Sequence, residues 1–190
     1  MTRYERWGKR SFDLFLGMTA VVALSPLLAL TAMAIKLEDR GSALFRQKRV
    51  GADGSEFTML KFRSMPIDTP HLPSDAIGAV TITRTGRVIR RLNVDELPQL
   101  LNIVRGDMSI VGPRPALPSQ LDVLAERTQN GARALRPGLT GLAQINSFNG
   151  MSPLEKARFD GEYAEQVTLG GDVWLILKTF GYLLKPPPTY

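Results

Sequence analysis

The sequence predicts a mainly helical α+β protein with a short β-hairpin, an N-terminal membrane helix broken at its middle, and amphipathic helices at the membrane interface. Three observations lead to this fold class. Residues 14–35 form an uncharged apolar run, two β-type runs flank the turn residues of 51–54, and capped helical patterns follow. We expect one structural unit with two parts: residues 1–40, the membrane helix and its flanks, and residues 41–190, a folded domain.

The apolar run from Leu14 to Ile35 contains 22 residues and no charge. At about 1.5 Å per residue, a helix of this length covers roughly 33 Å, which is enough to cross the hydrocarbon core of a bilayer. A buried helix of a soluble protein is an alternative, but such helices are rarely this long and this apolar. A secretory signal fits poorly, because no convincing small-residue cleavage site precedes the charged residues 36–40.

Ser25-Pro26 lies at the middle of this run. Proline removes a backbone donor and clashes with the preceding turn, and a serine before it can bond back to a helix carbonyl and bend the axis. Basic residues flank the run on both sides, whereas a spanning helix concentrates them on one side. We therefore favour a re-entrant helix, broken at Ser25 and Pro26, over a kinked span. The basic flanks are Arg3, Arg6, Lys9 and Arg10 before the run, and Lys36, Arg40, Arg46, Lys48 and Arg49 after it.

The composition favours anionic partners. The 190 residues carry a formal charge of +6 with a pI of about 9.9, which suits nucleic acid, anionic lipid or phosphorylated small molecules. Nucleic acid is not expected, since the basic stretch from residue 84 to 114 lacks stacking aromatics and the apolar run would stay unexplained. The chain has no cysteine, which excludes disulfides and thiolate metal sites.

Residues 43–47 and 56–60 are predicted as the two strands of a hairpin, since glycine and aspartate between them supply turn chemistry. Residues 66–83, which include His71, are predicted as an irregular loop. Nothing near His71 suggests a triad or a set of metal ligands, so a catalytic role for it is not expected.

A helix is expected over residues 95–104, with Gly106 as its stop signal and Pro98 within its first turn. Asp95, or a residue just before it, would then lie near the N-cap. There the helix dipole and the free backbone amides would stabilise both a carboxylate and a nearby phosphate.

Farther along the chain the sequence predicts two turns and three helices. The proline-containing turns 112–115 and 136–141 each present an arginine, and residues 117–134 between them are largely helical. Ser152-Pro153-Leu154-Glu155 is a capping box that begins the next helix. The last helix, residues 171–185, has a composition that suits a membrane interface, although core packing fits nearly as well.

Residues 93–100, Asn-Val-Asp-Glu-Leu-Pro-Gln-Leu, place Asp95 and Glu96 side by side in a strongly basic stretch. Six arginines and only three acids lie between residues 84 and 114, and a surface that gathers cations usually serves an anionic ligand. Two acids within it suggest a nucleophile, a metal site or both. Neighbouring helical residues point about 100° apart, so the two acids should have separate tasks. Decoration of a helix N-terminus is the alternative, since acids favour the first turn for dipole reasons alone.

Four basic residues are candidate phosphate clamps, because the charge of a nucleotide-activated diphosphate must be held before another anion can approach. Each could instead be a solvated surface charge, and it is the convergence of several on rigid turns that favours the functional interpretation. The four are Lys61, which leaves a predicted strand, Arg90, five residues before Asp95, and Arg114 and Arg136, on the two proline turns.

Eight stretches in the chain match the pattern of one family, in the family's order. They are residues 9–13 (Lys-Arg-Ser-Phe-Asp), 25–26 (Ser-Pro), 45–47 (Phe-Arg-Gln), 61–65 (Lys-Phe-Arg-Ser-Met), 86–90 (Gly-Arg-Val-Ile-Arg), 95–100 (Asp-Glu-Leu-Pro-Gln-Leu), 106–115 (Gly-Asp-Met-Ser-Ile-Val-Gly-Pro-Arg-Pro) and 136–141 (Arg-Pro-Gly-Leu-Thr-Gly). On these residues the chain resembles the small monotopic phosphoglycosyl transferases of bacterial glycan assembly, the bacterial sugar transferase family. One departure is Val94, where leucine is usual, a conservative change. The additional N-terminal transmembrane helices of larger relatives are missing, so a minimal catalytic unit is expected.

The resemblance implies transfer of a sugar 1-phosphate from a UDP-sugar to a polyprenyl phosphate, expected to be undecaprenyl phosphate, with release of UMP. Asp95 would be the nucleophile that forms a phosphosugar-enzyme intermediate. Glu96 would help to hold Mg²⁺, with Asp95 as the neighbouring ligand. The residues that would bind phosphate groups are Lys61, Arg90, Arg114 and Arg136.

The resemblance also implies a location. Ser25-Pro26 matches the family's helix break, which would make the segment re-entrant and keep residues 41–190, the catalytic domain, at the cytoplasmic face of the bacterial inner membrane. Asp13 matches a membrane-proximal acid and would tie the helix to the domain. The alternative from another class is a non-catalytic membrane-bound scaffold for glycan enzymes, which would not need this set of residues. The UDP-sugar, the glycan pathway, the exact metal ligands and the oligomeric state, a homodimer included, stay open.

Overall fold

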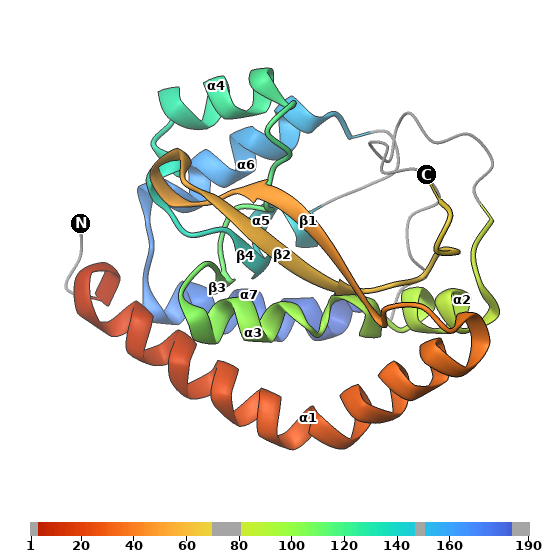
Figure 1. Cartoon of the computed structure of the whole chain (residues 1–190). Coiled ribbons are helices and arrows are strands. Elements are labelled where there is room, and N and C mark those ends of the chain that lie inside the picture. Colours follow the sequence, from red (N-terminus) through yellow and green to blue (C-terminus); the bar gives the residue numbers. More distant parts are fainter. Residues whose placement is uncertain (1–3, 70–80, 147–150, 184–190) are drawn as a thin grey trace.

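The structure, a computed structural model, describes residues 4–69, 81–146 and 151–183, and its helices and two small sheets agree with the predicted α+β class (Figure 1). In chain order the elements are η1 (Tyr4–Gly8), α1 (Lys9–Asp39), β1 (Leu44–Val50), η2 (Ala52–Gly54), β2 (Glu56–Phe62), α2 (Arg84–Arg91), η3 (Val94–Glu96), α3 (Gln99–Arg105), β3 (Ser109–Val111), α4 (Leu121–Gln129), η4 (Ala132–Ala134), β4 (Gly138–Thr140), α5 (Leu142–Ile145), α6 (Pro153–Glu165) and α7 (Leu169–Leu183).

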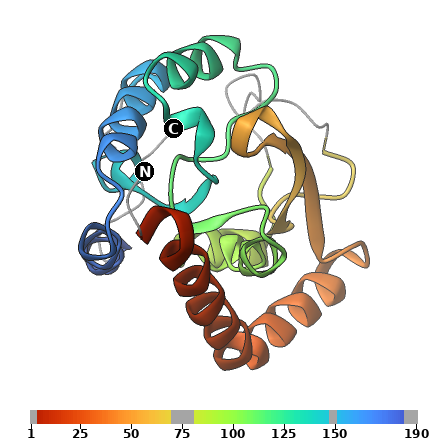
Figure 2. The same cartoon turned by 90° about the vertical axis from the view of Figure 1, so that its left-hand side faces the viewer.

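Helix α1 runs along one side of the molecule and bends near its middle, so that both ends approach the rest of the chain while the middle lies farthest from it (Figures 1 and 2). Pro26 lies inside this helix and has no N–H to donate to the carbonyl of Val22. The Ser25 hydroxyl donates to that carbonyl instead, over 2.8 Å. The helix is therefore continuous at the predicted break, because a side chain satisfies the backbone group that proline leaves free.

The middle of α1 is apolar and uncovered. Its most apolar window has a mean hydropathy of 2.1, and only 11% of that window is buried. Val22 is 72% exposed and Leu30 59% exposed. A core helix of a soluble protein would be covered by other elements, so the alternative of a buried soluble helix is wrong. By length and composition α1 can enter a bilayer.

Both arms of α1 pack against the domain. Asp13 on the N-terminal arm is buried and accepts hydrogen bonds from the Ser109 hydroxyl and the Ile110 amide, both over 3.0 Å. The predicted tie between this acid and the domain is thus confirmed. The C-terminal arm contributes to a core cluster formed by Ile35, Ala43, Phe62 and Ile89.

The same N-terminal arm is joined to the last two helices through one buried carboxylate, Asp172 of α7. Lys9 Nζ lies 2.7 Å from Asp172 Oδ2, and the hydroxyls of Tyr4 and Tyr163 each donate to this carboxylate over 2.6 Å. These contacts fix α6 and α7 relative to the start of α1.

The predicted hairpin is confirmed, with each strand two residues longer than expected. Strands β1 and β2 pair antiparallel from Leu44↔Phe62 to Val50↔Glu56. Asn102 of α3, which is fully buried, accepts from the Leu60 amide over 3.0 Å and donates to the Thr58 carbonyl over 2.8 Å. The Asn102 side chain therefore holds the hairpin against α3 through two hydrogen bonds to the backbone of β2.

A second sheet was not predicted. Strands β3 and β4 pair in parallel, with Ser109↔Gly138 and Val111↔Thr140 as partners, so residues 136–141 are not simply a turn. The strands have three residues each, too few for an alternating pattern to appear in the sequence. Gly138 is required for the pairing, since a Cβ there would lie 2.1 Å from the Gly112 nitrogen.

The helix predicted over residues 95–104 begins only at Gln99 and ends at Arg105, and Gly106, the predicted stop signal, follows it in the left-handed conformation. A helix from Asp95 would need an N–H from Pro98 to the Val94 carbonyl, and proline has none. The chain instead forms the separate 3-10 turn η3. The dipole of α3 therefore does not act on Asp95 in the way that the sequence suggested.

In the C-terminal half, the helix predicted over residues 117–134 begins only at Leu121 and is divided into α4 and η4 by Gly131, which has a φ of 79°. The capping box of Ser152 and Glu155 is confirmed. Helix α7 begins two residues earlier than predicted and presents a row of exposed apolar side chains. Most of the predicted loop 66–83, His71 included, lies outside the described residues.

Candidate active site

Asp95 and Glu96 lie on η3, between α2 and α3. Asn93 precedes this turn in the left-handed conformation, with a φ of 54°. Asparagine tolerates this conformation better than most residues. The Asn93 carbonyl accepts from the Glu96 amide over 3.3 Å. The tight turn therefore presents two consecutive carboxylates where the hairpin passes over α3.

Glu96 is held by cations from two other elements. Lys61 Nζ of β2 lies 2.7 Å from Glu96 Oε1, and Arg114 NH2, from the loop after β3, lies 3.5 Å from the same oxygen. Burial alone would raise the pKa of Glu96, but Lys61 and Arg114 outweigh it and lower the pKa to about 2. Glu96 is therefore a fixed, ionised acceptor.

Asp95 has a different environment. Within residues 4–69, 81–146 and 151–183, no ion pair joins its carboxylate to a cation. Burial raises the pKa of Asp95, against the opposing effects of Lys61 and Arg90. Lys61 and Arg90 therefore stabilise the charged Asp95 carboxylate electrostatically, although neither forms an ion pair with it in the described residues.

Arg90 reaches this site from α2. Its Nε donates to the Ser64 hydroxyl over 2.7 Å. Helix α2 can approach that segment because residue 86 is glycine, where a Cβ would lie 2.1 Å from the Ser64 carbonyl oxygen. Lys61, Arg90 and Arg114 are therefore brought together around the two acids, as predicted.

Arg136 is the predicted clamp that the structure does not bring into this group. Its side chain is exposed, and in the part of the chain that the structure describes no ion pair joins it to Asp95 or Glu96. Its backbone carbonyl lies against Gly112, beside the β3–β4 pair. A role for the Arg136 side chain in phosphate binding stays a prediction.

A shallow pocket opens beside Glu96, and two of its polar residues were missed in the sequence. The polar lining comprises Arg49, Lys61, Glu96, Gln99 and Arg114. Arg49 could have been found from strand alternation, since Gln47, Arg49 and Lys61 share one face of the hairpin. Gln99 is buried at the start of α3. Its position in the pocket could not be predicted, because the helix was expected to begin at Asp95 and not at Gln99.

The two acids fit a magnesium ion that is shared with a bound diphosphate. Mg²⁺ prefers oxygen ligands and is usually held by one or two carboxylates together with waters and substrate phosphates. Asp95 and Glu96 supply adjacent carboxylates, and the surrounding cations suit phosphate. Among the described residues no group of three or more acidic, histidine or cysteine side chains is placed to hold a metal ion. A magnesium ion at these two acids stays a prediction.

Comparison with known proteins places the chain among transferases of one kind. The family described as bacterial sugar transferase matches residues 4–186. A UDP-glucose:undecaprenyl-phosphate glucose-1-phosphate transferase of Caulobacter vibrioides is 39% identical over 191 residues, which cover 96% of this chain and 72% of the relative. The exopolysaccharide production protein ExoY of Sinorhizobium fredii is 37% identical, with 90% of this chain and 83% of the relative covered. A UDP-galactose-lipid carrier transferase of Erwinia amylovora is 35% identical over 98% of this chain but only 42% of the relative.

Proposed function

Because the chain belongs to the bacterial sugar transferase family, we propose that it transfers a sugar 1-phosphate from a UDP-sugar to undecaprenyl phosphate and releases UMP. Relatives named for UDP-glucose and UDP-galactose support this substrate class. The observation that carries the proposal is the contrast between the two acids: Glu96 is tied to Lys61 and Arg114, whereas no ion pair holds Asp95 within the described ranges.

In the first step an Asp95 oxygen attacks the phosphorus that bears the sugar. A bond forms between that oxygen and phosphorus, and the bond from phosphorus to the UMP oxygen breaks, so UMP leaves with the electron pair. The product is an acyl phosphate that joins the sugar phosphate to Asp95. Lys61, Arg90 and Arg114 stabilise the charge that develops on the phosphate oxygens.

In the second step an oxygen of undecaprenyl phosphate attacks the same phosphorus. The bond from phosphorus to Asp95 breaks, which restores the free carboxylate and gives a lipid diphosphate that carries the sugar. Asp95 and Glu96 would hold Mg²⁺, which when bound would neutralise charge on the diphosphate. Glu96 stays in place through both steps because its two cations anchor it.

We further propose that the protein is monotopic, with α1 re-entrant and the catalytic domain at the cytoplasmic face of the inner membrane. The bend of α1, its uncovered middle and the packing of both its arms on one domain support this arrangement. The exposed row of α7, which includes Trp174, Leu177 and Phe180, suits the membrane interface. A nucleophile at that surface can meet both a soluble nucleotide sugar and a lipid phosphate.

The nucleophile can be tested without the lipid acceptor. Wild-type protein incubated with UDP-sugar labelled in the sugar should release about one UMP per chain and retain the label, whereas Asp95→Asn should do neither. Lys48→Gln, a charge change on the outer face of β1, should behave as wild type. Full turnover by a folded Asp95→Asn protein, once undecaprenyl phosphate is added, would contradict the covalent mechanism. Testing several UDP-sugars in the same assay identifies the sugar.

A further inference from the structure

Arg49 is a cation of the pocket beside Glu96 that has no role in the steps above. It is the next-to-last residue of β1, and its side chain is fixed by two neutral acceptors. NH1 donates to the Pro115 carbonyl over 3.0 Å, and NH2 donates to Gln47 Oε1 over 2.6 Å. These bonds hold the guanidinium against the pocket wall that Arg114 and Pro115 also line.

The charge of Arg49 is poorly compensated. Within the described residues it forms no ion pair with an acid, and its Nε is buried without a hydrogen-bond partner. Burial and the neighbouring Arg114 lower the pKa of the guanidinium to about 10, and Glu96 opposes this only in part. A buried cation that is placed beside another cation, in a pocket with one acid, favours an anion as its missing partner.

We propose that Arg49 is a further binding residue of this site and holds a phosphate of the nucleotide-sugar diphosphate. This inference rests on the proposed function. Among the polar lining residues, Arg49, Lys61 and Arg114 bring three positive charges against the single negative charge of Glu96. A diphosphate would neutralise this excess, and a planar guanidinium can bond it through two N–H groups.

The position of Arg49 favours the nucleotide over the lipid. Strand β1 begins next to the end of α1 and runs away from it, toward the side of α4 and α6 (Figure 1). Arg49 lies at the far end of the strand, where Val50 donates to the Ala116 carbonyl. If α1 enters the membrane, this end of the pocket faces the water from which a nucleotide sugar arrives.

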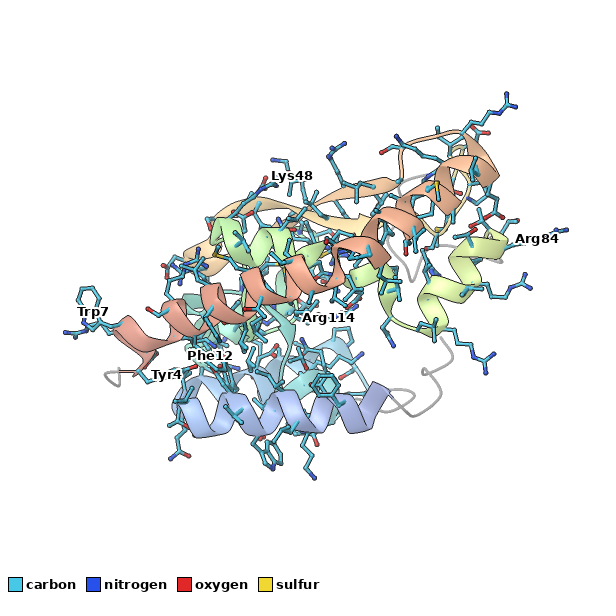
Figure 3. All side chains as sticks on the ribbon, turned by 90° about the horizontal axis from the view of Figure 1, so that it is seen from below. Tyr4, Trp7, Phe12, Lys48, Arg84 and Arg114 are labelled. Atoms are coloured by element: carbon cyan, nitrogen blue, oxygen red, sulfur yellow. The ribbon has the colours of Figure 1, made fainter. Side chains whose placement is uncertain are left out.

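The test compares two adjacent residues of β1. Arg49→Gln and Lys48→Gln each remove one positive charge, but Lys48 is exposed on the opposite face of the strand and points away from the ribbon (Figure 3). We expect Arg49→Gln to weaken the binding of UDP, measured by calorimetry, about tenfold or more, as for a charge-assisted hydrogen bond to phosphate. The KM for the UDP-sugar should rise in parallel. Lys48→Gln should stay within about twofold of wild type for both quantities, and the KM for undecaprenyl phosphate should change in neither variant.

Arg49→Lys gives a second measurement, which decides the matter if Arg49→Gln does not fold. Lysine keeps the positive charge but lacks the planar pair of N–H donors of the guanidinium. UDP binding should therefore weaken by a smaller factor than in Arg49→Gln, at an unchanged unfolding temperature. Unchanged UDP affinity in the folded variants would overturn the inference, and so would a rise in KM confined to undecaprenyl phosphate. Since UDP binding is read without turnover, a wild-type protein that binds UDP but forms no lipid product would contradict the proposed function and not the role of Arg49.

Discussion

Lys61 Nζ lies 2.7 Å from Glu96 Oε1, and this ion pair joins strand β2 to the turn that carries both acids. Arg114 approaches the same oxygen from the loop after β3. Glu96 is thereby anchored from two sides, while no ion pair in the described ranges fixes the neighbouring Asp95. Two adjacent acids thus differ because of the cations around them and not because of their place on a helix.

The anchoring of Glu96 predicts a specific loss of stability in acid. Its pKa of about 2 in the folded protein lies below the value of about 4.3 that is expected for an unfolded chain. Ionised Glu96 therefore stabilises the fold fully above the unfolded pKa, and this contribution disappears as the pH falls through the folded pKa. In metal-free buffer, wild type should lose about 1–2 kcal/mol more stability than Glu96→Gln between roughly pH 5 and pH 2. Unfolding measured at each pH checks this, and parallel curves for the two proteins would contradict it.

Local signals in the sequence predicted those parts of the fold that depend on neighbours in the chain. The capping box of Ser152 and Glu155, the stop at Gly106 and the hairpin all formed as expected. The β3–β4 pair could not be predicted in this way, since it depends on the close approach of Gly112 and Gly138. Pro98 gave a signal that could have been used, because it excludes a helix that begins at Asp95.

The site was predicted as far as residue type and motif allow. Lys61, Arg90 and Arg114 gather at the two acids, but among the described residues no ion pair joins the exposed Arg136 to them. Arg49 was passed over as a basic flank of the membrane segment, although strand alternation places it on the same face as Lys61. The sequence contains many basic residues, and it does not show which of them becomes buried without an acidic partner. That depends on the folded structure, as it does for Arg49.

Glu38 should position Arg90 from the C-terminal end of α1. Its two carboxylate oxygens accept from the backbone amides of Arg84 and Thr85 over 2.7 and 2.9 Å, at the start of the helix that carries Arg90. Glu38→Gln should lower kcat/KM several-fold because α2 is then less firmly placed. Combined with Arg90→Gln it should add little further loss, since both changes act through the same side chain.

Glu155→Gln is the matched control for Glu38. Glu155 also accepts a backbone amide at a helix start, that of Ser152 over 2.7 Å, but on α6. Its loss should lower the unfolding temperature about as much as Glu38→Gln does, without the change in kcat/KM. If both variants reduce kcat/KM equally, or if the Glu38 and Arg90 effects are additive, Glu38 has no specific connection to the site.

The buried carboxylate of Asp172 should be a major determinant of stability. Asp172→Asn would leave Lys9 buried without its counter-ion, which typically costs about 3–5 kcal/mol, or roughly 10 °C in unfolding temperature. Tyr163→Phe removes a single hydrogen bond to the same group and should cost about 1 kcal/mol. The double variant Lys9→Met with Asp172→Asn should recover part of the loss, because the Lys9 ammonium is then no longer buried without its ion-pair partner. Thermal unfolding in one detergent compares all three, and a double variant less stable than Asp172→Asn would contradict this account.

A re-entrant α1 can be distinguished from a kinked span by labelling. The two differ in whether both flanks of the helix are accessible to a reagent from the same side of the membrane. The chain has no native cysteine, so single cysteines can be introduced at Arg6 and Lys48, both exposed, and at Val22, in the uncovered middle of α1. With a membrane-impermeant thiol reagent we expect positions 6 and 48 to react in inverted inner-membrane vesicles and neither to react in intact spheroplasts. Position 22 should be protected in both, because lipid surrounds it, and should react once detergent is added. A span would place positions 6 and 48 on opposite sides and expose one of them in spheroplasts. Only the same-side result leaves both arms of α1 free to pack on one domain, as Asp13 and Ile35 do here.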